Sequence, residues 1–107
     1  MPFKRLIKME KFSPLRIKQL FDDCRIYTAH WASLKRGKIH YWKSGERITK
    51  KDLIRKFGQA RGLLWALGYE PKLSKKVTKF YREFYHLAKP FILHFYRKYK
   101  RKVTKIK

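Results

Sequence analysis

The 107-residue chain carries 30 lysines and arginines against 7 aspartates and glutamates, a formal net charge of +23, yet 44% of its residues are hydrophobic and 17% are aromatic. A disordered basic tail would lack these aromatic residues, and an isolated globular domain would be destabilised by so much self-repulsion. The length excludes two domains with separate cores, so we expect one small domain that binds a polyanion.

Membrane-spanning and secreted classes fit poorly. The uncharged stretch GLLWALGY at 62–69 has eight residues, whereas a membrane-spanning helix needs about 20. Residues 1–12, MPFKRLIKMEKF, lack the apolar run of a secretory signal and alternate basic with apolar residues, a pattern compatible with an uncleaved organelle-targeting segment. The single cysteine, Cys24, excludes an internal disulfide and a multi-cysteine zinc site, and we expect it in the core.

The first expected helix runs from Ser13 to about Leu34. Ser13 is a capping residue followed by Pro14 at the first helical position, and Gly37 ends the element. Its apolar residues recur at spacings of three and four: Ile17, Leu20, Phe21, Cys24, Tyr27, Trp31 and Leu34. The next segment, KIHYWKSGER at 38–47, is too short for a helix and is predicted to be extended or hairpin-like.

The second expected helix has the strongest start and stop signals. Thr49 and Asp52 form a capping box, flanked by the hydrophobic staple positions Ile48 and Leu53. Gly68, followed by a proline, predicts the end. The predicted apolar face consists of Leu53, Phe57, Ala60, Leu64 and Leu67. Asp52 is therefore interpreted as a cap and not as a catalytic carboxylate.

The third expected helix begins near Ser74 and continues into the eighties or nineties, with a kink or break at Pro90. Its predicted apolar stripe consists of Val77, Phe80, Tyr81, Phe84, Leu87, Ala88, Phe91 and Phe95. Residues 97–107 contain seven bases and no acid. The fold class is thus mainly α, with about three helices and a short extended connection in a domain at 13–96, between a basic extension at 1–12 and a basic tail at 97–107.

Two glycines four residues apart interrupt the second helix in RKFGQARG at 55–62. On a helical wheel Gly58 and Gly62 fall with Lys51, Arg55 and Gln59, nearly opposite the apolar face. Glycine permits close approach of a backbone, and the neighbouring side chains suit phosphate, ribose or base-edge contacts. We expect RNA on this face; the alternative is a tight crossing with another helix.

Catalytic chemistry finds no support in the sequence. Adjacent Asp22 and Asp23 point in different directions on a helix, and His86 and His94 are too far apart in sequence to bind one metal from adjacent turns. No phosphate-binding glycine loop or nucleophile motif is present. We expect a protein that is not an enzyme and that has no cofactor, metal or small-molecule substrate.

A short, aromatic, helix-rich chain with basic ends and no catalytic constellation resembles the small basic proteins of the ribosome. The resemblance is one of class, and the basic amphipathic start favours a mitochondrial ribosome in the matrix over a cytosolic one. It implies a structural role that stabilises folded ribosomal RNA beside neighbouring ribosomal proteins. The predicted RNA contacts are Lys51, Arg55, Gly58, Gln59, Gly62, Lys75, Lys76, Lys79, Arg82, Arg97, Lys98, Lys100, Arg101, Lys102, Lys105 and Lys107.

Two alternatives stay open. Helices at about 50–67 and 75–89 could form a helix-turn-helix-like DNA-binding module with a long turn. A basic accessory subunit of an organelle-membrane complex would instead place its aromatic third helix on a hydrophobic partner and its cations near anionic lipid.

Overall fold

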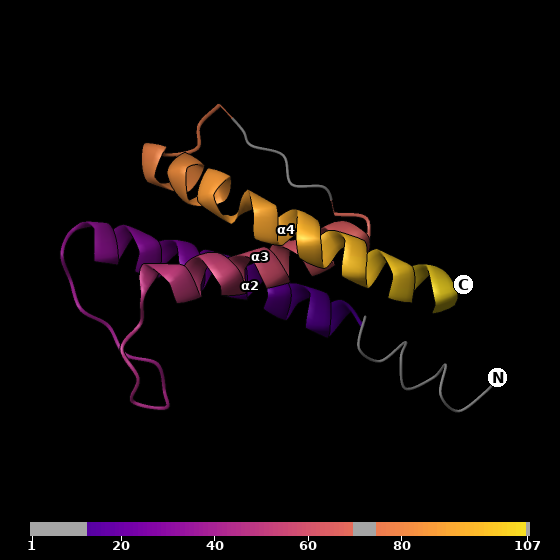
Figure 1. The fold of residues 1–107 in the computed structure, drawn as a ribbon, viewed down its shortest axis with the longest axis horizontal. Helices are drawn as coiled ribbons and strands as arrows, with labels where there is room; N and C mark the ends of the chain where they lie inside the picture. The colour runs from indigo at the N-terminus through magenta and orange to yellow at the C-terminus, as the bar shows by residue number, and fades with distance from the viewer. Residues whose placement is uncertain (1–12, 70–74, 107) are drawn as a thin grey trace.

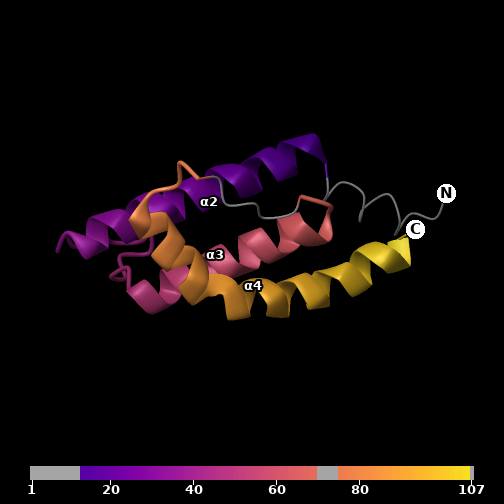
Figure 2. The same ribbon diagram turned by 90° about the horizontal axis from the view of Figure 1, so that it is seen from above.

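The computed structural model describes residues 13–69 and 75–106, which form three helices: α2 (Pro14–Lys35), α3 (Lys50–Ala66) and α4 (Lys79–Ile106). The central helix is α3, which packs on both of the others. It runs antiparallel to α2 and in the same direction as α4 (Figures 1 and 2). The prediction of a small, mainly α fold with three helices is confirmed.

The expected caps fix the helix ends. The Ser13 hydroxyl oxygen accepts a hydrogen bond from the Arg16 N–H at 3.3 Å, and that of Thr49 accepts one from the Asp52 N–H at 3.1 Å. After α3, Gly68 takes a left-handed conformation with φ of 104°. Side-chain acceptors at the start and a glycine beyond the end satisfy backbone groups that a helix leaves unpaired. The predicted bounds of the first two helices are correct to about a residue.

The segment between α2 and α3 is a tight hairpin, as predicted. Tyr41 and Arg47 form an antiparallel bridge, and the Trp42 N–H donates to the Glu46 carbonyl oxygen at 2.8 Å. Gly45 turns the chain with φ of 92°. The hairpin projects from the end of the bundle where α2 ends and α3 begins (Figure 1).

An aromatic stack joins the three helices at the centre of the core. The Phe84 ring of α4 lies 4.9 Å from that of Trp31 and 4.5 Å from that of Phe57, measured between centroids. The buried hydrophobic set consists of Leu20, Cys24, Trp31, Ile48, Leu53, Phe57, Ala60, Leu64, Phe84, Ala88 and Ile92. Burial of this apolar surface is the main stabilising contribution within the domain.

The apolar stripe predicted for the third helix is partly wrong. Ile92 is buried although the prediction omitted it, whereas Phe80 and Leu87 are exposed although the prediction included them. The buried face of α4 is therefore rotated toward Ile92, because α4 contacts α3 along one side and α2 only near its beginning.

Helix α4 also differs from its predicted bounds. It begins at Lys79, with the Thr78 hydroxyl oxygen accepting from the Tyr81 N–H at 3.2 Å, whereas the start expected near Ser74 lies outside the described residues. It continues through Pro90 to Ile106, and Figure 2 shows it curving along α3 and not breaking. Ala88 and Ile92 are buried on either side of the exposed Pro90. The stabilisation from packing both segments of α4 on α3 therefore outweighs the loss of the helical hydrogen bond that Pro90 cannot donate.

The placement of the two α3 glycines corrects the RNA interpretation of that face. Both are buried against α4: a Cβ added at Gly62 would lie 2.7 Å from Phe95 Cβ and 2.8 Å from the Ile92 carbonyl oxygen, and one at Gly58 would overlap Phe91. The prediction that they lie on an open face is wrong. The alternative of a tight helix crossing is correct, because α3 packs α2 and α4 on different sides and so has two buried stripes.

Candidate nucleic-acid interface

The predicted contact residues on α3 form a narrow exposed strip. Lys51, Arg55 and Gln59 are exposed, while Gly58 and Gly62 lie beneath α4. The Gln59 side-chain amide donates to the Tyr99 hydroxyl oxygen at 3.1 Å, which ties the strip to the last part of α4. The two glycines cannot contact RNA, because α4 covers their backbone.

A second group of cations surrounds the beginning of α4. Lys75, Lys76, Lys79 and Arg82 are all exposed, and the first turn of the helix contains no acid. The amino end of a helix carries a partial positive charge, so these cations lie in an unfavourable field unless an anion balances them. The group fits a phosphate-bearing partner, and it lies at the opposite end of α4 from the basic tail.

The third group lies on the last turns of α4, where residues 97–106 continue the helix. Arg97, Lys98, Lys100, Arg101 and Lys102 are exposed. Lys105 belongs to the last turn, and Lys107 lies outside the described residues. Cations at the carboxyl end of a helix interact favourably with its dipole. Their charge therefore supports the helix that presents them.

Aromatic rings hold this part of α4 against α3. The Tyr96 ring stacks on Trp65 with centroids 4.0 Å apart, and Lys100 Nζ donates to the Tyr96 hydroxyl oxygen at 2.6 Å. Lys102 Nζ lies 5.8 Å from the Tyr99 ring centroid. The lysine stems thus pack on aromatic faces while their charged ends remain in solvent.

Carboxylates neutralise few of the cations. Arg25 pairs with Asp22, and Lys35 Nζ lies 3.1 Å from Glu83 Oε1 in a bridge between α2 and α4. The chain has 30 basic and 7 acidic side chains, so its basic residues outnumber the carboxylates by 23. The surface potential is therefore strongly positive.

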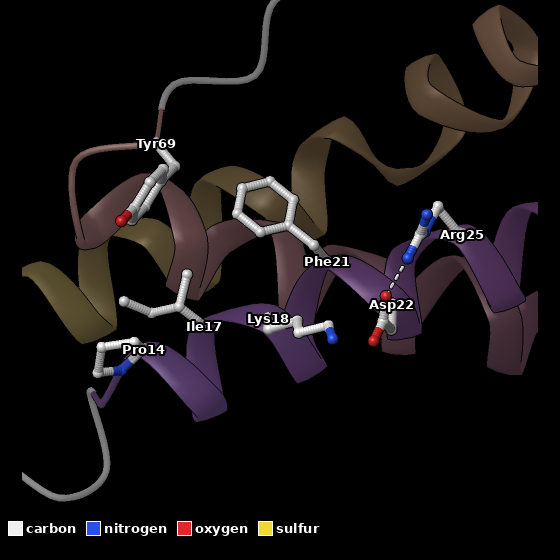
Figure 3. Close-up of a pocket in the computed structure, with 7 residues that line it drawn as sticks. All are labelled: Pro14, Ile17, Lys18, Phe21, Asp22, Arg25 and Tyr69. Carbon is white, nitrogen blue, oxygen red and sulfur yellow. Dashed lines mark hydrogen bonds and ion pairs between the residues drawn. The ribbon is translucent and has the colours of Figure 1, made fainter.

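The pocket drawn in Figure 3 lies at the amino-terminal half of α2. Phe21 and Tyr69 meet edge to face with ring centroids 5.5 Å apart, Ile17 completes the apolar wall, and Lys18 lies at the rim (Figure 3). The carboxylate present, Asp22, is bonded to Arg25. This arrangement is a shallow apolar hollow with a charged edge and offers no pair of groups for acid–base chemistry.

A second pocket, of about 600 Å³, lies between the hairpin, α2 and the beginning of α3. Its aromatic walls come from Tyr27, His30, Tyr41 and Trp42. None of these residues is among the predicted contacts; the aromatic pair Tyr41 and Trp42, directly before the turn, is the sequence signal that could have indicated two of them, whereas Tyr27 and His30 lie on α2 and carry no such signal.

Burial favours the neutral forms of one titratable group in the core and two at its edge. Burial raises the pKa of the Cys24 thiol to about 11, although the nearby Arg61 opposes this shift. Burial likewise raises the pKa of Tyr27 and lowers that of His30, with His40 adding to the latter effect. Within residues 13–69 and 75–106 no cluster of three or more His, Cys, Asp or Glu side chains could hold a metal ion. No helix in the same ranges has the length and apolarity to cross a bilayer.

Comparisons with known proteins found no match. The chain matches no protein-family model, no curated protein and no solved structure.

Proposed function

We propose that this protein is a structural RNA-binding protein that stabilises folded ribosomal RNA, in contact with neighbouring ribosomal proteins. A mitochondrial ribosome is the favoured location. The proposed contacts are the exposed members of the three basic groups, with phosphates neutralising lysines and arginines.

The observation that carries the proposal is the helical presentation of exposed cations at residues 97–102. These residues extend a helix whose inner face is packed on α3 through Phe95, Tyr96 and Tyr99. A rigid element with five exposed cations on its last turns suits a phosphate backbone better than a solvated, flexible tail does, because binding costs less conformational entropy.

The helix-turn-helix alternative is less well supported by the arrangement of α3 and α4. In that motif two helices cross at about 90–120° and are joined by a turn of three or four residues. Here α3 and α4 run side by side in the same direction, and residues 67–78 separate them (Figures 1 and 2). Moreover, the beginning of α4 is packed on Trp31 and Phe57 through Phe84.

Gradient sedimentation of a cell lysate tests the proposal. Ribosomal particles, chromatin and detergent-solubilised membrane complexes migrate differently. We expect the protein to migrate with a ribosomal subunit and to be released from it when the RNA is digested. Migration with chromatin or with a membrane complex would favour one of the two alternatives.

A further inference from the structure

We infer that the pocket between the hairpin and the α2–α3 helices binds a single unpaired RNA base; this inference rests on the proposed RNA-binding function. The pocket is built by residues outside the basic groups already described. It offers aromatic surfaces for stacking, whereas the basic groups offer positive charge.

Aromatic rings make up the walls of the pocket. Tyr27 and His30 meet Trp42 nearly at right angles, with centroid separations of 6.3 and 6.2 Å. Tyr41, at the rim, is 64% exposed. Stacking on aromatic side chains is the usual way in which proteins hold a base that is not paired.

The hairpin places these rings rigidly. The Trp42 N–H donates to the Glu46 carbonyl oxygen at 2.8 Å, the Ile48 N–H donates to the His40 carbonyl oxygen at 2.8 Å, and Ile48 is buried in the core. Lys56 of α3 holds its Nζ 5.0 Å from the Trp42 ring centroid. The site is therefore formed before a ligand arrives, which lowers the entropic cost of binding.

The polar groups of the pocket fit a base better than a phosphate or an acidic peptide. Glu46, Asp52 and Ser44 line it together with Lys43 and Lys56. The two acidic and two basic side chains balance in charge, so the lining does not favour an anion, whereas carboxylates accept hydrogen bonds from the amino and imino groups on base edges. Paired bases do not expose their faces for stacking, so a base held here must be unpaired.

A smaller hollow of about 160 Å³ beside the pocket offers a place for the rest of the strand. Tyr27 and Lys56 line both, and Arg16, Asp23, Gln59 and Tyr99 also line the smaller hollow. Phosphates next to the held base would meet Lys56 and Arg16, and Tyr99 lies among the cations of the last turns of α4.

The test compares two RNA hairpins with the same loop and equal numbers of phosphates, one with a single-base bulge and one with an abasic nucleotide at the position of the bulge. The full-length protein should bind the bulged RNA more tightly. Since stacking of one base contributes about 1–3 kcal/mol, Trp42→Ala should reduce the ratio of the two Kd values by roughly 5- to 150-fold or abolish the preference. Trp42→Phe, which keeps a ring, should retain most of it.

Two further variants separate stacking from folding. Tyr41→Ala removes a largely exposed ring and should weaken the preference without loss of helical circular dichroism, so it decides the question even if Trp42→Ala unfolds the hairpin. Tyr69→Ala removes a ring that is 41% exposed, follows the end of α3 and does not line the pocket, and it should leave the preference unchanged. Equal binding of the bulged and the abasic RNA by the wild-type protein, or an unchanged ratio in both pocket variants, would overturn the inference while leaving ribosomal association intact. Failure of the protein to sediment with ribosomes would instead reject the proposed function.

Discussion

Gly62 of α3 faces Phe95 of α4 so closely that a Cβ on the glycine would lie 2.7 Å from the Cβ of the phenylalanine. The Tyr96 amide nitrogen would lie at 2.9 Å from the same added atom. The spacing of four residues between Gly58 and Gly62 thus lets two helices that run in the same direction approach closely, at the cost of the low helix propensity of glycine.

Substitution of Gly62 by leucine should destabilise the protein. The higher helix propensity of leucine favours the helix by about 0.8 kcal/mol, but a side chain here meets α4 backbone, and overpacking of this kind typically costs about 1–3 kcal/mol. Because the atoms in the way are backbone atoms of α4, the cost should lie near the upper end of this range, which leaves a net loss of about 2 kcal/mol in the free energy of unfolding, measured by urea titration in a buffer where the chain is folded.

Arg55→Leu is the matched control for this substitution. It introduces the same side chain on the exposed strip of the same helix and should change the free energy of unfolding by less than about 0.5 kcal/mol. A Gly62→Leu protein as stable as Arg55→Leu would show that α4 does not lie on the glycine face in solution.

Neutralising the end of α4 should flatten the salt dependence of RNA binding. Substituting Arg97, Lys98 and Arg101 by glutamine removes three exposed charges, one of which lies over the Phe95 ring, and leaves the stack of Tyr96 on Trp65 in place. The slope of log K against log salt should fall by roughly 0.7–0.9 for each phosphate that the protein no longer neutralises. Filter binding over a salt series measures the slope.

Glutamine substitutions at Lys18, Arg36 and Lys38 of the α2 region provide a charge-matched comparison, because all three side chains are exposed. They should change the slope less than the substitutions at the end of α4. Equal effects of the two triple variants would argue that the charge acts without regard to position.

The thiol of Cys24 should react only when the domain opens. Its pKa of about 11 leaves almost no thiolate at neutral pH, and the side chain is buried. Alkylation by iodoacetamide should therefore be slow in the native protein and fast in denaturant. Ser44→Cys in a Cys24→Ala background places a thiol on the exposed hairpin and should react quickly. Equally fast alkylation of Cys24 in the native wild-type protein would contradict the described packing.

The same shift predicts how this thiol contributes to stability as pH rises. The unfolded thiol ionises near its ordinary pKa of 9.0, whereas the folded thiol keeps its proton until about 11. Between these values the unfolded state binds fewer protons than the folded state, so stability falls with rising pH. Tyr27, Tyr81 and Tyr85 have raised pKa values and act in the same direction. Chemical unfolding of wild type and Cys24→Ala in this range should show a smaller pH dependence in the variant.

The isolated chain should gain helix when its charge is neutralised. A small core opposes a net charge of +23, and an anion that binds the folded state stabilises it by mass action. Circular dichroism should therefore show more helix with sulfate or RNA than in buffer of low ionic strength. A fully helical chain that melts cooperatively without any polyanion would show that the core suffices.

Capping residues and glycines in the sequence predicted where the helices begin and end. They did not predict which helix faces pack together. Ser13, Thr49 and Gly68 mark helix ends through bonds to nearby backbone groups, which sequence alone reveals. The burial of Gly58 and Gly62 depends on α4, a helix that lies much further along the chain. Because a helical wheel records one apolar stripe, it placed the second buried side of α3 in solvent.

The packing of residues 97–106 and the hairpin pocket also depend on contacts between segments that lie far apart in the sequence. The run of bases at 97–107 gives no local sign that Tyr96 and Tyr99 pack on α3 and extend the helix. The pocket joins Tyr27, Trp42 and Lys56 from three different segments. Neither arrangement can be read from spacing within one element.

The measurement that tests the central claim most directly is sedimentation of the protein, tagged and expressed at its natural level, through a sucrose gradient with and without ribonuclease. We predict that it migrates with a ribosomal subunit, resists a moderate salt wash and moves to the top of the gradient after RNA digestion. A protein that stays at the top of the untreated gradient, or that migrates with chromatin or a membrane complex regardless of ribonuclease, would contradict the claim that it binds ribosomal RNA.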